Sequence, residues 1–398
     1  MRDAEATVLK GQALLLQSDT LAAQKLTRLL LATPTLPTAV RYDTQLLSAQ
    51  VFLTLQEPLS ARRVLEPLLK LAVSPVVEGK TPQPSREQKL SVQVLSAQTL
   101  LALRPPQQSE ARALLESVVG QAPERADARL LLGRLLRELG AWSPAEQQLS
   151  AALRMDERSI PVRRELAMLL MLRGDFAKAR ELYTELLKDE QDAELVLAAA
   201  RAERLDGAPD LALQTLAKVK RSRGELTTKH DEALLAERAK ILLALERHTE
   251  AVSLLQPLMS DLLQLRSTAL AALLITAHLA LAEPPQKQAE LLKARAVLTQ
   301  VQLLKKRVPP PPWLPDTSLQ LAEVQLLLAE GNKQTAGTQL TALVDGIHAR
   351  PPGATATSDE LLLNKQAEKL LVTLKGPLPP TKPATATAAM KNAPGNRR

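Results

Sequence analysis

The sequence predicts an all-α protein built from repeated helical hairpins. Apolar residues make up 45% of its 398 residues, whereas aromatic residues make up only 2%. The core must therefore consist mainly of Leu, Ala and Val. Leu and Ala are strong helix formers, whereas sheets favour β-branched and aromatic side chains. A chain of this length can form one large domain, two domains or a repeat array. The low aromatic content favours an array, because stacked helical repeats bury many small interfaces and need few large rings.

A unit of roughly 34 residues recurs in the middle of the chain. Aligning Gly140 with Gly174 also aligns Ala145 with Ala179, and the next glycine of the series is Gly207. Each copy reads as a helix, a turn that contains glycine, and a second helix with a central alanine. Small residues in both helices let the two axes cross closely, and glycine takes the left-handed conformation that ends the first helix. The repeat therefore predicts stacked helical hairpins.

One of these turns contains Arg173-Gly174-Asp175, a tripeptide best known as a cell-adhesion signal. Gly140 and Gly207 hold the same place in the neighbouring repeats, and neither belongs to such a tripeptide. We therefore predict a structural inter-helix turn. Asp175 is expected to cap the following helix by accepting a backbone N–H bond.

The unit resembles the tetratricopeptide repeat, a helix–turn–helix of about 34 residues. The matching residues over 126–220 stand at consensus positions: Leu132, Gly133, Gly140 and Ala145 in one copy, and Leu166, Ala167, Gly174, Phe176, Ala179 and Tyr183 in the next. The sequence departs from the consensus because Leu replaces most aromatic residues, and Arg129, Arg163 and Val196 stand in place of the first Trp. The resemblance implies a right-handed superhelical solenoid of stacked antiparallel hairpins with a concave groove.

Weaker copies extend the array in both directions. A small residue followed by Ala 12 positions later recurs as Gly11/Ala23, Ala49/Ala61 and Ala239/Ala251, and the turns at Pro105-Pro106 and Pro284-Pro285 are stretched. The array therefore covers roughly residues 4–345 and contains about nine hairpins.

Proline-rich stretches divide the chain, because proline interrupts helices. The predicted segments are two degenerate hairpins over 1–73, a proline-rich loop over 74–88, the main array over 89–308, a polyproline connector over 309–316, the last hairpin and a capping helix over 317–375, and a disordered basic tail over 376–398. The capping helix is expected because the end of a repeat array must be covered. The tail is rich in Pro, Ala and Thr and lacks a core-forming pattern.

Charge and motif content exclude several function classes. The net charge is +8, and the tail over 376–398 contributes half of it through four cations and no acid. The rest of the chain is only mildly basic, so no nucleic-acid partner is expected. There is no cysteine, and the four histidines form no metal-binding motif. We expect no catalytic residue, no cofactor and no metal site, and we expect His278 to be a satisfied core residue.

No membrane span is predicted. The longest apolar stretch, Ala269 to Ala282, is 14 residues long and is interrupted by Thr276 and His278. It is too short to cross a bilayer and suits a buried helix. The sequence favours a cytoplasmic protein, or a periplasmic or envelope-associated one if a leader was removed.

The same resemblance implies that the first helix of each hairpin lines the groove. It also implies that the residue directly after the small residue of each first helix faces into the groove. These inward positions hold Gln12, Gln50, Gln98, Arg134, Met168, Arg201, Lys240 and Gln325. Cations also stand one turn away in the central hairpins, so the candidate partner-binding residues are Arg134, Arg137, Arg164, Met168, Arg201, Arg204 and Lys240. A basic row with methionine suits an extended acidic peptide. The alternative is a solvated helix face, where Arg and Gln are common.

The sequence thus favours a non-catalytic protein–protein interaction scaffold or assembly factor that binds an acidic partner segment in the groove. The alternative function is a component of a bacterial envelope or secretion, pilus or polysaccharide-export system. The sequence does not set the oligomeric state.

Overall fold

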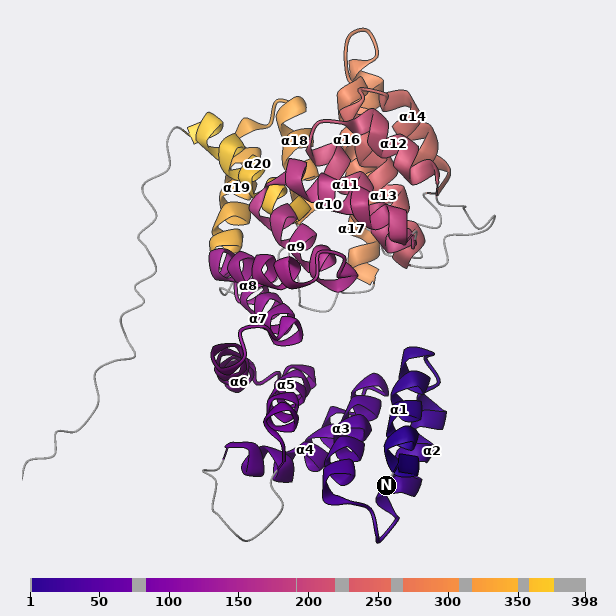
Figure 1. The fold of residues 1–398 in the computed structure, drawn as a ribbon. Coiled ribbons are helices and arrows are strands. Elements are labelled where there is room, and N and C mark those ends of the chain that lie inside the picture. The colour runs from indigo at the N-terminus through magenta and orange to yellow at the C-terminus, as the bar shows by residue number, and fades with distance from the viewer. Residues whose placement is uncertain are drawn as a thin grey trace, which may run out of the picture. The chain divides into compact units, whose positions relative to one another are not determined.

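The computed structural model describes residues 2–73, 84–190, 192–218, 229–258, 268–307, 317–349 and 358–375. Every regular element within these ranges is a helix, which confirms the predicted all-α class. The chain divides into two compact units, Met1–Leu170 and Met171–Arg398, and Figure 1 shows their helices in chain order. The polyproline connector, the basic tail and most of the proline-rich loop lie outside the described residues.

The N-terminal unit is a stack of antiparallel helix pairs. It contains α1 (Arg2–Leu16), α2 (Thr20–Leu31), α3 (Thr38–Thr54), α4 (Pro58–Val73), α5 (Arg86–Ala102), α6 (Gln108–Gln121), α7 (Ala126–Glu138), α8 (Trp142–Met155) and most of α9 (Ile160–Arg173). The first helices α1, α3, α5 and α7 each pack on their own second helix, and successive members of this series pack on one another. This is the contact pattern of a solenoid, in which every repeat is covered by its neighbour.

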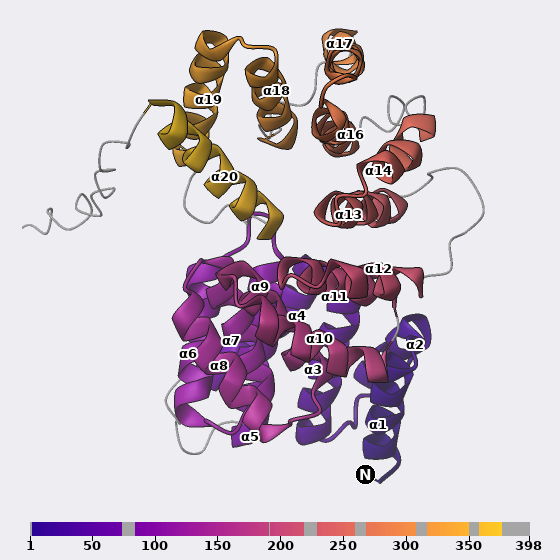
Figure 2. The same cartoon turned by 90° about the horizontal axis from the view of Figure 1, so that it is seen from above.

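The C-terminal unit repeats the same arrangement. After the end of α9 it contains α10 (Phe176–Asp189), α11 (Ala193–Leu205), α12 (Pro209–Ala217), α13 (Lys229–Ala244), α14 (His248–Leu255), the short η1 (Gln256–Leu258), α16 (Thr268–Leu281), α17 (Lys287–Arg307), α18 (Thr317–Ala329), α19 (Lys333–His348) and α20 (Ser358–Lys375). The first helices α11, α13, α16 and α18 pack on one another in turn, and Figure 2 shows these pairs from above.

Seven of the nine hairpin turns among the described residues share one backbone feature, a residue with positive φ. Residues with positive φ end the first helices at Ser18, Gln56, Gly140, Gly174, Gly207, Glu246 and Gly331, and the two remaining turns contain the cis bonds Arg104–Pro105 and Pro284–Pro285. The positions predicted from the glycine spacing are therefore the inter-helix turns. The prediction that Asp175 caps the following helix is wrong, because its side chain makes no capping hydrogen bond to α10. Its carboxylate lies 3.3 Å from the guanidinium of Arg173 instead.

The small residues of the repeat lie where the two helices of a hairpin approach most closely. A Cβ atom added at Gly133 of α7 would stand 2.6 Å from Cγ of Leu149 in α8, closer than real Cβ contacts. Ala145 and Leu149 are fully buried in this crossing. The role predicted for the small positions is confirmed here.

The last helix, α20, covers the end of the array. It packs on α18 and α19, and its Ala367 and Leu371 join a buried cluster with Leu340 and Val344 of α19. This agrees with the capping helix expected at the end of the array. Its first turn also contacts α11 and α13, through the ion pairs of Asp359.

The buried histidine of α16 is satisfied by its neighbours. Nδ1 of His278 lies 2.7 Å from a carboxylate oxygen of Glu290 in α17, and Nε2 lies 3.3 Å from the side-chain oxygen of Gln256. His278 is 2% exposed. These contacts agree with a core residue rather than a ligand.

Candidate functional site

Three of the predicted groove cations lie together in the C-terminal unit. Arg201 and Arg204 project from the last turns of α11, and Lys240 projects from α13. They surround two carboxylates, Glu237 of α13 and Asp359 of α20. We call these five residues the basic cluster; together they carry one net positive charge.

Glu237 forms the buried side of the basic cluster. It is fully buried, and Arg204 donates from Nε to one of its oxygens at 2.5 Å. Arg201 donates to the other oxygen at 3.4 Å. A buried carboxylate needs such partners because its desolvation is costly. Glu237 therefore fixes the two guanidinium groups that face Asp359.

Asp359 is the second carboxylate of the basic cluster, and its side chain is 17% exposed. Its two oxygens accept from Nη2 of Arg204 at 2.9 Å and from Nζ of Lys240 at 2.6 Å. Burial raises the pKa of Asp359, but the charges of Lys240, Arg204 and Arg201 outweigh burial and hold this pKa well below its usual range. Burial lowers the pKa of Arg204, and the charges of Glu237 and Asp359 raise it above its ordinary value. The cluster is thus a built carboxylate-binding arrangement.

The other predicted residues lie in the N-terminal unit. Arg137 of α7 contacts Glu165 of α9 at 3.1 Å and is only 10% exposed. Arg134 reaches the same carboxylate at 3.8 Å, also contacts Glu138 at 3.2 Å, and stays 57% exposed. Met168 of α9 is 39% exposed, and Arg164 is half-buried and engaged by other groups. Arg134 and Met168 are thus the most accessible predicted residues of this unit.

Sequence reasoning missed the carboxylates that organise both groups of cations. Glu165 and Glu237 each stand three residues before an inward position, Met168 and Lys240. The repeat alignment that located the cations therefore carried a signal for these two acids. Asp359 had no such signal, because it lies outside the repeats and is 155 residues from Arg204.

The sequence predicts neither a membrane span nor a metal site, and two findings on the described residues bear on these points. No helix there is long and apolar enough to span a membrane. The same residues contain no group of three or more His, Cys, Asp or Glu side chains that could hold a metal ion.

Comparison with known proteins gives one family match. Residues 107–162, which span α6 to α8 and the start of α9, match the tetratricopeptide repeat model. No curated protein matches the chain. Similar solved structures include a tetratricopeptide repeat protein from Parabacteroides merdae, with 15% identity, 76% of this chain and 100% of that chain covered, and a TM-score of 0.42. Another is pilF of Pseudomonas aeruginosa, with 21% identity, 59% and 97% covered, and a TM-score of 0.44. A third is the quorum sensor NprR from B. thuringiensis in its apo form, with 12% identity, 94% and 99% covered, and a TM-score of 0.49.

Proposed function

Because the chain contains tetratricopeptide repeats, a fold that serves protein–protein interaction, we propose that it is a non-catalytic interaction scaffold that binds an acidic segment of a partner protein. The binding residues are the cations of the basic cluster, Arg201, Arg204 and Lys240. The observation that carries this proposal is Asp359, whose carboxylate already lies among all three cations.

The contacts of Asp359 indicate how a partner carboxylate would be held. A guanidinium and an ammonium group donate to it at 2.9 and 2.6 Å, and charge-assisted hydrogen bonds of this kind are stronger than neutral ones. The cations are preorganised by buried Glu237, so little ordering is needed when a carboxylate binds. An acidic residue of a partner would take the place of Asp359, and α20 would then compete with the partner.

The accessible residues of the N-terminal unit offer a second contact for the same kind of segment. Arg134 is 57% exposed and supplies a positive charge. Met168 is 39% exposed, and its flexible thioether side chain adapts to apolar side chains of different shape. An extended segment that alternates acidic and apolar residues has the matching chemistry.

Peptide binding to variants of the full chain tests the proposal. The probe is a fluorescein-labelled peptide of alternating Glu and Leu, measured by fluorescence anisotropy. Asp359→Asn removes the competing carboxylate and should tighten binding. Arg201→Gln combined with Lys240→Gln should weaken binding about tenfold or more. Arg204 is left unchanged, because it donates the shortest hydrogen bond to buried Glu237 and its loss would destabilise the fold.

The matched control changes three exposed lysines on second helices, Lys178→Gln, Lys188→Gln and Lys333→Gln. It removes more positive charge than the double variant and touches no residue of the basic cluster. If the control weakens binding as much as the double variant does, the peptide responds only to net charge and the proposed site is wrong.

A further inference from the structure

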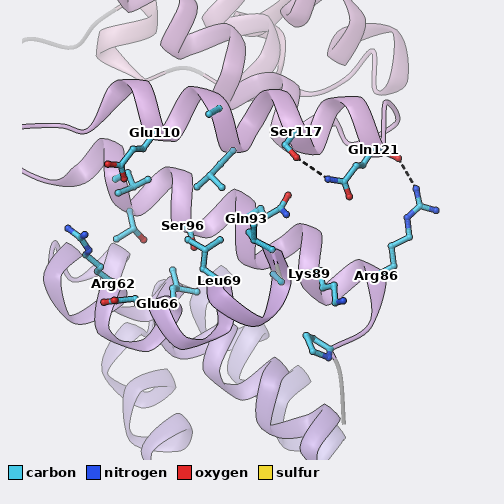
Figure 3. A pocket seen from close by; sticks show the side chains of 18 residues that line it. Arg62, Glu66, Leu69, Arg86, Lys89, Gln93, Ser96, Glu110, Ser117 and Gln121 are labelled. Carbon is cyan, nitrogen blue, oxygen red and sulfur yellow. Dashed lines mark hydrogen bonds between the residues drawn. The ribbon is translucent and has the colours of Figure 1, made fainter. Parts of the chain in front are cut away.

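The N-terminal unit contains a pocket that the repeat pattern does not predict. It has a volume of about 880 Å³ and lies between the second helices α4 and α6, above the first helix α5. Figure 3 shows Gln93 and Ser96 of α5 in the middle of this pocket, with charged side chains at both ends. Its volume is within the range of ligand-binding pockets in proteins.

Two polar side chains in the pocket are buried without a partner. Gln93 is 6% exposed and Ser96 is 5% exposed. The side-chain oxygen of Gln93 and the hydroxyl of Ser96 have no hydrogen-bond partner among the described residues. Buried polar atoms almost always have one. Thr99 on the same helix differs from Ser96, because its hydroxyl donates to the carbonyl of Leu95 at 2.7 Å.

The rest of the lining combines apolar walls with a basic end. Leu65 and Leu69 of α4 and Leu114 of α6 form apolar walls. Lys89 lines one end, and its side chain forms no hydrogen bond or ion pair with other described residues. Beside it, Arg86 donates to the carbonyl of Gln121 at 2.7 Å, which links α5 to α6 at this end. Lys89 thus presents the one ammonium group among the described residues that line the pocket.

From these features we propose that the pocket binds a short extended segment of a partner protein that carries a carboxylate. An N–H group of the segment donates to the oxygen of Gln93, and its carboxylate lies against Lys89. An apolar side chain packs between Leu69 and Leu114. A purely apolar ligand would leave the polar atoms of Gln93 and Ser96 without partners, which disfavours it.

The dimensions agree with such a segment. The pocket follows α5 from Lys89 to Leu100, a length of about 16 Å at the rise of an α-helix. An extended chain covers this length with about five residues. The site lies wholly in the N-terminal unit, so it is distinct from the basic cluster and does not depend on the function proposed for it.

Binding of defined pentapeptides to the full chain tests this inference. The probes are a set of fluorescein-labelled pentapeptides, measured by fluorescence anisotropy. Each contains one Leu, one Asp and three Ala, and the set covers every placement of Leu and Asp. We expect saturable binding by a subset with a fixed spacing of Leu and Asp. Gln93→Leu should weaken that binding about tenfold and should leave the melting temperature unchanged or raise it, because an unpaired buried oxygen is removed.

A charge reversal at Lys89, the basic end of the pocket, provides a second test. Lys89→Glu should weaken binding about tenfold or more and remove the preference for Asp over Asn. Lys10→Glu, which places the same change on an exposed position of α1, should have no effect. The inference is overturned if no pentapeptide binds, if Lys10→Glu acts like Lys89→Glu, or if Gln93→Leu lowers the melting temperature and leaves binding intact.

A further variant tests whether a segment of the chain itself occupies the pocket. Val73 and Pro84, which border residues 74–83, both line it. Replacing 74–83 with Gly and Ser residues of equal number should leave pentapeptide affinity unchanged. A tenfold gain in affinity would identify 74–83 as the occupant and overturn the proposal of an external partner.

Discussion

Glu203 of α11 is a buried carboxylate that only one neighbouring side chain satisfies. It is 4% exposed, and the hydroxyl of Thr215 donates to one of its oxygens at 3.0 Å. The other oxygen has no hydrogen-bond partner in the described part of the chain. Burial raises the pKa of Glu203, and the hydrogen bond from Thr215 and the charges of Lys218 and Arg180 only partly oppose this. The residue therefore reduces stability when it is charged.

Glu203→Gln is expected to raise the melting temperature at pH 8, by an amount equivalent to about 1 kcal/mol. Because the pKa of Glu203 is higher in the folded than in the unfolded state, the unfolded state loses its proton at a lower pH. The free energy of unfolding therefore falls as pH rises from the unfolded pKa to the folded pKa. The gain should therefore disappear near pH 3, where both states of the wild type are protonated. Thermal melts across pH check this. Exposed Glu181→Gln is the control, and an equal gain there would contradict the explanation.

Gly174 has a φ of +86°, a conformation that residues with a Cβ rarely adopt. Gly174→Val should lower the free energy of unfolding by about 1–2 kcal/mol, measured by chemical denaturation. Glu246 occupies the equivalent turn with a φ of 57°, so Glu246→Gly should have no cost or a small gain. If Gly174→Val is neutral in stability and changes cell adhesion instead, the tripeptide is a ligand and not only a turn.

Among the elements, α20 combines two kinds of contact. Ala367 and Leu371 pack it on the last hairpin, whereas Asp359 fixes its first turn to α11 and α13. The apolar contacts are insensitive to pH, and the pair of His348 and Glu368 beside them is exposed and contributes little. The largely buried ion pairs of Asp359 depend on pH. The two ends of one helix should therefore respond differently to acid.

Hydrogen exchange of α20 at different pH values tests this. Because the pKa of Asp359 is lowered in the folded state, its contribution to stability is complete above the unfolded pKa of about 4 and is lost as pH falls further. We expect lower protection factors in the first turns of α20 below pH 3, and the same decrease at pH 7 in Asp359→Ala. Protection around Leu371 should change less. A uniform decrease along α20 would show that the ion pairs hold the whole helix.

At the scale of the whole molecule, the chain divides into two compact units at Leu170 and Met171. Repeat arrays are stabilised by contacts between neighbours, so their cooperativity can break along the chain. Trp142 lies in the N-terminal unit, on α8. In a Trp313→Phe variant it is the single tryptophan of the chain, and it reports that unit alone.

We expect urea unfolding of this variant to give different midpoints by tryptophan fluorescence and by far-ultraviolet circular dichroism. The first signal follows one unit, and the second follows all helices. Coincident midpoints and slopes would mean that the two units unfold as one cooperative body, contrary to this prediction.

The sequence by itself determined the class, the repeat unit and the turn positions. These depend on local properties: helix propensity, a glycine or another residue with positive φ at most turns, and small residues such as Gly133 where two helices cross. Because every repeat needs the same kind of residue at its turn, the regular spacing of Gly140, Gly174 and Gly207 marks the turns in the sequence. The same alignment placed Arg201, Arg204 and Lys240 on related helix positions, and they do lie together.

Only the tertiary structure decided what surrounds these residues. Asp359 meets Lys240 across 119 residues of sequence, and Gln93 and Ser96 lie in a pocket whose walls come from α4 and α6. Such contacts follow no repeated spacing, because each depends on how one particular helix packs on others distant in the chain. Periodicity predicts which face a residue occupies, whereas the partner on the opposite side is set by packing alone.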